Sequence, residues 1–408
     1  MSASRIARIA TMALVVALAF GGCVGQARPS GSGSPSAGPG SALAWSMVGV
    51  EQPGDVAAEL ARPVFCSPCH AASSTAMTGV TAGKPGLVAV GYALPGPVAA
   101  VWTSTDGREW QRDPAVQGAG GGALEAVAAA GSHLVAVGSS ATGAGAWTSG
   151  DGRTWTPAAS VALPGRPGLS AMQAVLSWGG MLVAGGYADP DAATHEAAAW
   201  TSHDGTVWTR VPDGPAWRDA RVFDLAAYRG GLIAVGSAGG VDRAGAAVWL
   251  STDGRTWERI SSPAFAAGSM RSVASDGSTL VAVGVDAADD GAVAWTSPDG
   301  HRWSVVPHGP AFQNYGLSAR ILSLLHTGGG WLAAGWVSSA ANGSGTIWSS
   351  PDGRAWTRVS PSPAMLGGGA ADLTVAGSRI VVVGSTGWPD NITAAAWLGV
   401  PSGGPATP

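Results

Sequence analysis

The clearest candidate for redox chemistry is the segment Cys66-Ser67-Pro68-Cys69-His70. A Cys-x-x-Cys-His pattern is the attachment signature of c-type haem, in which both thiols bond to the haem and the histidine binds iron. In an oxidising compartment the two cysteines also suit a local disulfide. The segment is too short for a cytochrome domain, and three further zinc ligands are not evident. We therefore expect a Cys66–Cys69 disulfide and no cofactor, with covalent haem at Cys66, Cys69 and His70 as the alternative.

A second set of residues could bind an anion. Arg221, Arg271 and Arg320 recur in three successive sections of the chain, and Tyr315 lies near the third. Guanidinium groups brought together would favour a carboxylate. However, the number of residues between each arginine and the apolar segment that follows it differs among the three. We therefore weigh this anion pocket against solvent-facing loop arginines, and we prefer the second interpretation.

Aromatic side chains recur at a third place. Tyr92, Tyr187 and Trp336 each follow the glycine of an apolar run, and Trp388 lies further along the last such loop. The same loops carry polar residues, namely Asp189, Asp191, His195, Glu196, Asp242, Arg243, Asp286, Asp289, Asp290, Asp390 and Asn391. Rings with polar neighbours suit stacking on a sugar or contact with a peptide. We predict ligand binding by these four aromatic residues and Arg271, against the alternative that acidic loops only keep the protein soluble.

A repeated unit must position these residues. Its most regular part is Ser-x-Asp-Gly-x-x-Trp, which occurs at residues 104–110, 149–155, 202–208, 251–257, 297–303 and 350–356. Asp-Gly signals a tight turn, because glycine adopts positive φ freely and Asp and Ser side chains accept hydrogen bonds from turn N–H groups. The tryptophan begins the next strand and offers a large ring for burial. We therefore assign structural roles to Asp106, Asp151, Asp204, Asp253, Asp299 and Asp352.

Each copy of this seven-residue motif, which we call a box, belongs to a longer unit with four segments that are typical of strands. A second tryptophan precedes each box, and an apolar run with a glycine lies further upstream, at residues 87–91, 134–138, 182–186, 232–236, 280–284, 332–336 and 380–384. The box tryptophans recur every 45 to 53 residues, as β-propeller blades do. The seventh unit lacks a box, whereas residues 43–50 read as a spare fourth strand. We predict an all-β, seven-bladed propeller of four-stranded antiparallel blades, closed by this N-terminal strand. Glu125, Gln173 and Arg271 would face its central channel.

The repeats resemble the Asp-box (BNR-repeat) propellers of the sialidase-like superfamily over about residues 43–400. The resemblance implies the fold but no single activity, because the superfamily includes sialidases, other glycosidases, sortilin-type receptors and photosystem assembly factors. Its best-known box, Ser-x-Asp-x-Gly-x-Thr-Trp, is one residue longer between Asp and Trp than the boxes of this chain.

An enzyme of this group would need residues that the chain does not clearly supply. Sialidases use an Arg triad, a Tyr–Glu nucleophile pair and an Asp acid/base. The nearest match to their first arginine motif is Arg62-Pro63-Val64, which lacks the Ile between Arg and Pro, and the chain has only 4 Tyr. We see no pair of carboxylates suited to general acid/base catalysis. The resemblance therefore favours a non-catalytic member.

The N-terminus has the features of an export signal. Arg5 and Arg8 precede a short apolar stretch at residues 9–20, which is typical of a signal peptide. Phe20-Gly21-Gly22-Cys23 resembles a bacterial lipobox, which implies lipidation of Cys23. Ordinary secretion with cleavage near Ala27 is the alternative.

The expected domain organisation follows from these segments. Residues 1–22 form the signal peptide, and residues 23–42 form the lipidated cysteine and a tether rich in Gly, Ser and Pro. Residues 43–400 form the propeller, and residues 401–408 form a disordered tail.

Composition limits the partners. Charged residues make up 12% of the chain, against about 25% in an average soluble domain, and the net charge of -4 excludes the basic face of a nucleic-acid binder. We expect a monomeric, extracytoplasmic lipoprotein of a bacterial cell envelope that touches the membrane through its lipid anchor only. It would bind a cell-envelope protein or glycan without catalysis. A divergent sialidase-like glycoside hydrolase and a c-type haem redox protein are the alternatives.

Overall fold

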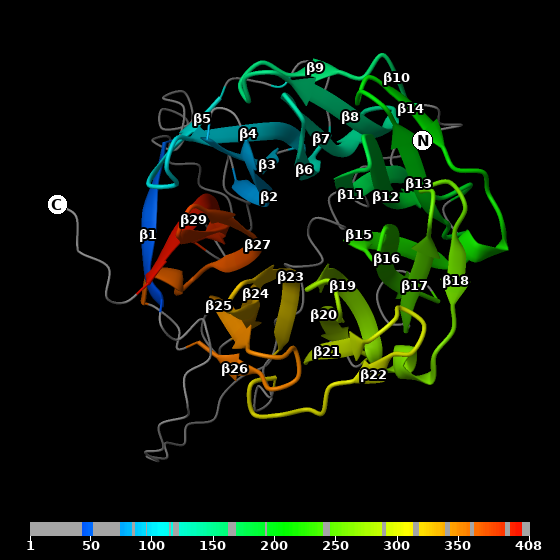
Figure 1. Ribbon diagram of the computed structural model, residues 1–408. Helices are drawn as coiled ribbons and strands as arrows, with labels where there is room; N and C mark the ends of the chain where they lie inside the picture. The colour runs from blue at the N-terminus through cyan, green and yellow to red at the C-terminus, as the bar shows by residue number, and fades with distance from the viewer. Residues whose placement is uncertain are drawn as a thin grey trace, which may run out of the picture.

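The computed structural model describes residues 43–51, 74–83, 86–94, 96–113, 116, 122–161, 169–191, 194–239, 245–287, 291–312, 318–338, 343–359, 363–387 and 392–401. Within these ranges the chain is built from strands and short 3₁₀ turns. None of these residues forms a helix long and apolar enough to cross a bilayer. The strands form seven blades arranged in a ring (Figure 1), which confirms the predicted fold class.

The blades run in chain order, each from its innermost to its outermost strand. Blade 1 contains β2 (Thr75–Gly83), β3 (Gly86–Ala93), β4 (Val98–Ser104) and β5 (Glu109–Arg112). Blade 2 contains β6 (Leu124–Ala130), β7 (His133–Ser140), β8 (Gly143–Ser149) and β9 (Thr156–Pro157). Blade 3 contains β11 (Ser170–Trp178), β12 (Met181–Ala188), β13 (Ala197–Ser202) and β14 (Val207–Arg210). Blade 4 contains β15 (Ala220–Tyr228), β16 (Gly231–Ala238), β17 (Ala246–Ser251) and β18 (Glu258–Ile260).

The remaining blades have the same order. Blade 5 contains β19 (Gly268–Ser275), β20 (Leu280–Asp286), β21 (Ala292–Ser297) and β22 (Ser304–Val305). Blade 6 contains β23 (Ala319–Thr327), β24 (Gly330–Ser338), β25 (Gly343–Ser350) and β26 (Thr357–Arg358). Blade 7 contains β27 (Gly369–Ala376), β28 (Arg379–Thr386), β29 (Thr393–Pro401) and β1 (Leu43–Glu51). The 3₁₀ turns η2 (Pro215–Trp217), η3 (Pro263–Ala267) and η4 (Pro363–Met365) lie in linkers between blades.

The N-terminal strand closes the ring, as predicted. β1 pairs antiparallel with β29, with Met47 opposite Trp397, and so becomes the fourth strand of blade 7. Its last residues then pair parallel with β5 of blade 1, with Val50 opposite Trp110. A single strand thus removes the free edge of β29 and joins the two ends of the ring.

The hydrophobic core consists of separate clusters that lie between adjacent blades. Seven clusters of buried side chains each lie between two adjacent blades. Each contains one tryptophan of a third strand, from the set Trp102, Trp147, Trp200, Trp249, Trp295, Trp348 and Trp397. The indole N–H groups of Trp249, Trp295, Trp348 and Trp397 donate to the carbonyls of Ala216, Ala264, Ala311 and Ala364, at 2.7–2.9 Å. These bonds fix the linkers against the sheets.

Every innermost strand has a β-bulge, and a glycine of the second strand makes room for it. In blade 2 the register shifts between Leu124 and Ala126, opposite Gly138. A Cβ on Gly138 would lie 2.0 Å from the carbonyl oxygen of Ala123. The repeated glycine of the apolar runs is therefore explained by close approach of backbone, and it leaves one extra residue, Glu125, in the inner strand.

Candidate functional site

The bulged residues occupy one equivalent position in all seven blades. They are Thr78, Glu125, Gln173, Phe223, Arg271, Leu322 and Ala371. Glu125, Gln173 and Arg271, which were grouped from the sequence, therefore do share one position. The inner strands surround the centre of the ring (Figure 1), and two of these residues from adjacent blades are in contact, because Arg271 lies over the ring of Phe223.

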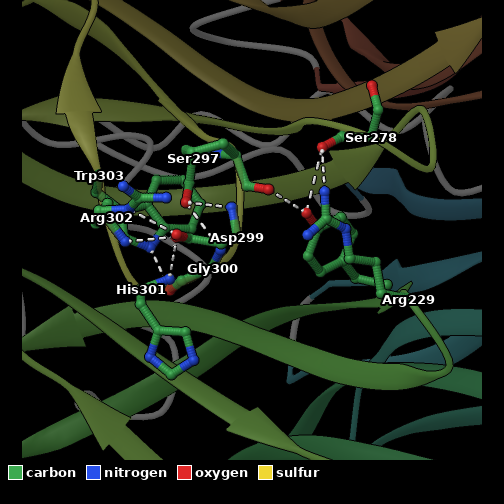
Figure 2. Close-up of polar contacts among 10 residues, drawn as sticks. Arg229, Ser278, Ser297, Asp299, Gly300, His301, Arg302 and Trp303 are labelled. Atoms are coloured by element: carbon green, nitrogen blue, oxygen red, sulfur yellow. Dashed lines mark hydrogen bonds and ion pairs between the residues drawn. The ribbon is translucent and has the colours of Figure 1, made fainter.

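The two ends of the ring differ in what they carry. The turns between first and second strands lie at the same end as the boxes, because the Tyr228 hydroxyl donates to the Pro298 carbonyl at 2.6 Å. Figure 2 shows this box and the neighbouring Arg229, which donates to the carbonyl of Ser278 at 3.3 Å. The opposite end, which we call the mouth face, consists of the loops between second and third strands and the linkers between blades.

At the box end, the aspartates hold turns. In the fourth box, Asp253 Oδ1 accepts from the N–H of Thr256 at 2.7 Å, and Ser251 Oγ accepts from the N–H of Gly254 at 2.8 Å. The Trp257 indole donates back to the Gly254 carbonyl at 3.1 Å. An aspartate accepts backbone N–H bonds in all six boxes. These bonds lower the pKa of Asp151, Asp204, Asp253 and Asp299 to about 2, as expected for anions that complete a turn.

Toward the mouth face, three successive blades each contribute one half-buried polar side chain: Tyr92 of β3, Glu125 of β6 and Tyr187 of β12. Burial raises the pKa of Glu125 to about 7. Burial, and then the charge of Glu125, raises the pKa of Tyr92 to about 12. Burial also raises the pKa of Tyr187, to which Glu125 contributes as well. The charge of Glu125 thus acts on both phenols, and its carboxyl group can exchange a proton near neutral pH.

A buried ion pair adjoins Tyr187. Arg221 of β15 is only 3% exposed. Its guanidinium carbon lies 3.8 Å from the centre of the Tyr187 ring, and its NH2 lies 2.7 Å from Asp189 Oδ2. His195 Nδ1 lies 3.4 Å from the same carboxylate oxygen, and Asp189 Oδ1 accepts from the N–H of Glu196 at 3.0 Å. Stacking and ion pairing together hold this guanidinium in one orientation. Asp189 therefore does more than keep a loop soluble.

The arginines correct a prediction made from the sequence. All three lie within inner strands, and Arg221 and Arg320 are buried, so they are not solvent-facing loop residues. Arg271 lies over the ring of Phe223 at 4.2 Å, and Arg320 lies over the ring of Trp336 at 5.6 Å. Their unequal spacing has a simple cause, because Arg271 occupies the bulge whereas the other two precede it.

The predicted aromatic positions are equivalent, but they belong to strands and not to loops. Tyr92, Tyr187 and Trp336 pair with Ala76, Ala171 and Arg320 at one register position. Trp336 is 8% exposed, so its ring offers little surface to a ligand. Trp388, Tyr315, Cys23, Cys66, Cys69, His70, Asp242, Arg243, Asp289, Asp290, Asp390 and Asn391 lie outside the described residues.

Sequence reasoning missed two acidic residues that link the blades. Asp224 Oδ2 accepts from Ser272 Oγ at 2.7 Å, and Asp372 Oδ1 accepts from Ser323 Oγ at 2.6 Å. Asp372 Oδ2 also accepts from the N–H of Val80 across the closure of the ring, at 2.9 Å. Burial raises the pKa of Asp224 to about 6 and also raises that of Asp372. In the sequence, each of these aspartates comes one residue after the bulged position of its repeat, and this shared position is the signal that could have identified them. Among the described residues, no three His, Cys, Asp or Glu side chains form a group that could hold a metal ion.

No family model matches the chain, and comparison with curated proteins finds none similar to it. Solved structures do show similarity. YCF48 bound to D1 peptide is 14% identical, with 75% of this chain and 97% of that chain covered and a TM-score of 0.41. A sialidase of Trypanosoma rangeli in complex with the inhibitor DANA is 14% identical, with 81% of this chain and 55% of that chain covered and a TM-score of 0.45.

A thermostable family-43 glycoside hydrolase is 15% identical, with 55% of this chain and 86% of that chain covered and a TM-score of 0.33. At such identities and scores the likeness carries nothing about activity or ligand. The assignment of the propeller rests on the strand pairing itself.

Proposed function

We propose that this chain is an extracytoplasmic binding scaffold, anchored by lipid at Cys23, that binds a cell-envelope protein or glycan at its mouth face without changing it chemically. The observation that carries the proposal is a set of interacting side chains from four successive blades: Arg221 lies over the ring of Tyr187, and the charge of Glu125 acts on both Tyr92 and Tyr187. This is the kind of polar and aromatic surface that recognises a sugar or a peptide.

Rigidity supports binding as the role of this cluster. Tyr92 and Tyr187 lie in strands that are paired on both sides, and Arg221 is fixed by Asp189. A ligand would therefore meet side chains that are already ordered, which lowers the entropy lost on binding. Both tyrosines keep part of their surface exposed, so a ring face and a hydroxyl remain for contact.

The other acids near the inner strands support a role without catalysis. Asp189 is committed to Arg221, and Asp224 and Asp372 accept bonds from neighbouring blades. A glycosidase commonly needs two carboxyl groups on either side of the scissile bond. Of these four acids, Glu125 alone accepts no side-chain hydrogen bond from another residue within the described part of the chain.

The test is binding to arrays of glycans and of cell-envelope proteins, followed by titration of the best ligand. Tyr92→Phe and Tyr187→Phe each remove one mouth-face hydroxyl, and Tyr228→Phe is the matched control at the box end. We expect the first two to weaken binding by about three- to tenfold, the cost of one hydrogen bond, and the control to leave it unchanged. Equal affinity in all three would place the binding site elsewhere.

Glu125 also favours a second candidate, a glycoside hydrolase. A half-buried carboxyl group with a pKa of about 7 can protonate a glycosidic oxygen at neutral pH. Hydrolysis of fluorogenic glycosides that is lost in Glu125→Gln would support this candidate and contradict the non-catalytic scaffold. Intact glycosides after prolonged incubation with wild-type protein would exclude it for those substrates.

A further inference from the structure

Two tryptophans of the ring have a buried N–H group that no described residue accepts. Trp102 and Trp200, the third-strand tryptophans of blades 1 and 3, are both 0% exposed. Within the described part of the chain, neither indole N–H has a hydrogen-bond acceptor. A donor that is buried away from water destabilises the fold unless it is paired, so we expect an acceptor at each of these groups.

The equivalent tryptophans show what the acceptor is. In blades 4, 5, 6 and 7 the indole N–H donates to the middle residue of a Pro-Ala-apolar motif in the linker before the blade. The four motifs are residues 215–217, 263–265, 310–312 and 363–365. In the first three, the N–H of the third residue donates to the carbonyl of the residue before the proline at 3.1 Å, which closes a tight turn.

The third residue of the motif fills the space between two blades. Four such residues lie in the same buried cluster as the third-strand tryptophan of their blade, namely Trp217, Phe265, Phe312 and Met365. In blade 2, Val116 of Pro114-Ala115-Val116 lies with Trp147 in the same way. The described members of the other two clusters include no residue of such a motif. These are the clusters of Trp102 and Trp200, so the N–H groups without an acceptor occur where no described motif is present.

The linker before blade 1 contains a matching sequence. The described residues end at Glu51 and resume at Ser74, and between them only one proline is followed by two apolar residues, in Pro63-Val64-Phe65. Residues 52–62 precede this motif, whereas two residues suffice between Ile260 and Pro263, so chain length does not prevent the same placement. The linker before blade 3 has no counterpart, because residues 159–169 hold proline only before glycine.

We propose that residues 63–65 dock between blades 7 and 1 as a turn of the same kind, in which the Val64 carbonyl accepts from the indole N–H of Trp102. Phe65 then packs against Trp110, the box tryptophan of blade 1. The same contact joins Trp217 to Trp257, Phe265 to Trp303 and Phe312 to Trp356, with ring centres 6.0–6.3 Å apart. This docking does not depend on the function proposed for the mouth face.

The docked turn also determines where the cysteine pair lies. Linkers between blades belong to the mouth face, and Thr75, the first residue of β2, pairs with Ala93 beside Tyr92. A chain that leaves the turn at Cys66 and enters β2 at Thr75 therefore holds Cys66 and Cys69 at the mouth face.

The test places a photo-crosslinking residue in the full-length protein. We expect Phe65→p-benzoylphenylalanine to crosslink on irradiation to residues 98–112 of the same molecule, which contain Trp102 and Trp110. Ala57→p-benzoylphenylalanine, in the same linker but outside the motif, is the matched control and should not give this product. Crosslinks from position 65 to a second copy or to another protein, or none to residues 98–112, would overturn the proposal.

Hydrogen exchange of two further variants tests the hydrogen bond itself. Trp102→Phe removes the indole N–H of blade 1, and Trp200→Phe removes the equivalent group of blade 3, whose linker lacks the motif. We expect the Phe65 N–H to exchange about five- to tenfold faster in Trp102→Phe and to change less than about twofold in Trp200→Phe. Unprotected exchange of this N–H in the wild-type protein, or the same effect of both variants, would contradict the proposal.

Discussion

At the scale of single residues, environment decides which acids titrate in the physiological range. Backbone N–H bonds lower the pKa of Asp151, Asp204, Asp253 and Asp299 to about 2, whereas burial raises the pKa of Glu125 to about 7. The sequence placed Glu125, Gln173 and Arg271 in one group, because repeats align them. It could not show the pairing of Arg221 with Asp189, because those residues are 32 positions apart and belong to different blades.

Glu125 makes stability depend on pH in a defined direction. Its pKa rises from 4.5 to about 7 on folding, so the folded protein holds a proton that the unfolded chain has already released between these values. Its contribution to stability is present below pH 4.5 and is lost as pH rises to about 7. Glu125→Gln should therefore remove this change in the free energy of unfolding, which is at most about 3 kcal/mol over the pH range. Urea unfolding at pH 4.5, 6 and 8 checks this, and an unchanged slope would contradict the assigned pKa.

At the scale of strands and turns, repeated residues report backbone geometry. The sequence revealed the glycine of every apolar run. It did not reveal the reason for the glycine, because the bulge depends on pairing with the preceding strand, as when Gly138 lies opposite Leu124. The box turns were predictable, since Asp, Gly and Ser act locally there. The assignment of Tyr92 and Tyr187 to loops was wrong, because both second strands continue two residues past the glycine.

Gly138 tests the account of the bulge. A methyl group on Gly138 would lie 2.0 Å from the Ala123 carbonyl oxygen, whereas one on Gly150 would meet no atom within 4 Å. We expect Gly138→Ala to lower the free energy of unfolding by about 1–3 kcal/mol, and Gly150→Ala to change it by less than about 0.5 kcal/mol. Urea denaturation of both variants checks this. Equal stabilities would mean that the glycine is not required by the bulge.

Asp253 tests the structural role of the boxes. Alanine removes the acceptors for the Arg255 and Thr256 N–H groups, whereas asparagine keeps one oxygen. We expect Asp253→Ala to cost about 1–2 kcal/mol of stability and Asp253→Asn to cost less. Because folding lowers the pKa of Asp253 from 3.8 to about 2, the carboxylate stabilises the folded protein above about pH 4, and this stabilisation is lost as pH falls to about 2. Thermal unfolding at pH 7 and pH 2.5 measures both effects, and identical losses for the two variants would argue against the turn hydrogen bonds.

At the scale of the whole molecule, the ring depends on its first strand. Seven apolar runs and six boxes predicted this arrangement from the sequence, because a missing strand at one end and a spare one at the other require closure. The pairing of β1 with both β29 and β5 goes further, since it joins blade 7 to blade 1. The first described strand begins at Leu43, so a chain that starts there keeps every described strand of the ring.

Truncation tests closure. A variant that begins at residue 52 lacks β1 and exposes the edge of β29, so we expect a markedly lower melting temperature and self-association. A variant that begins at residue 43 keeps β1 and is the matched control, which should melt like the full-length protein. A peptide of residues 43–51 added to the first variant should restore part of the loss. Equal melting temperatures for the two truncations would show that β1 is dispensable.

The measurement that tests the central claim most directly is hydrogen–deuterium exchange of the full-length protein with and without the best ligand from the arrays. Binding at the mouth face predicts slower exchange in residues 87–94, 124–127, 181–191 and 220–224, which carry Tyr92, Glu125, Tyr187 and Arg221. The box turns at residues 251–257 and 297–303 should exchange at the same rate in both states. Protection confined to the box turns or to the outer strands, with none at the mouth face, would contradict the claim.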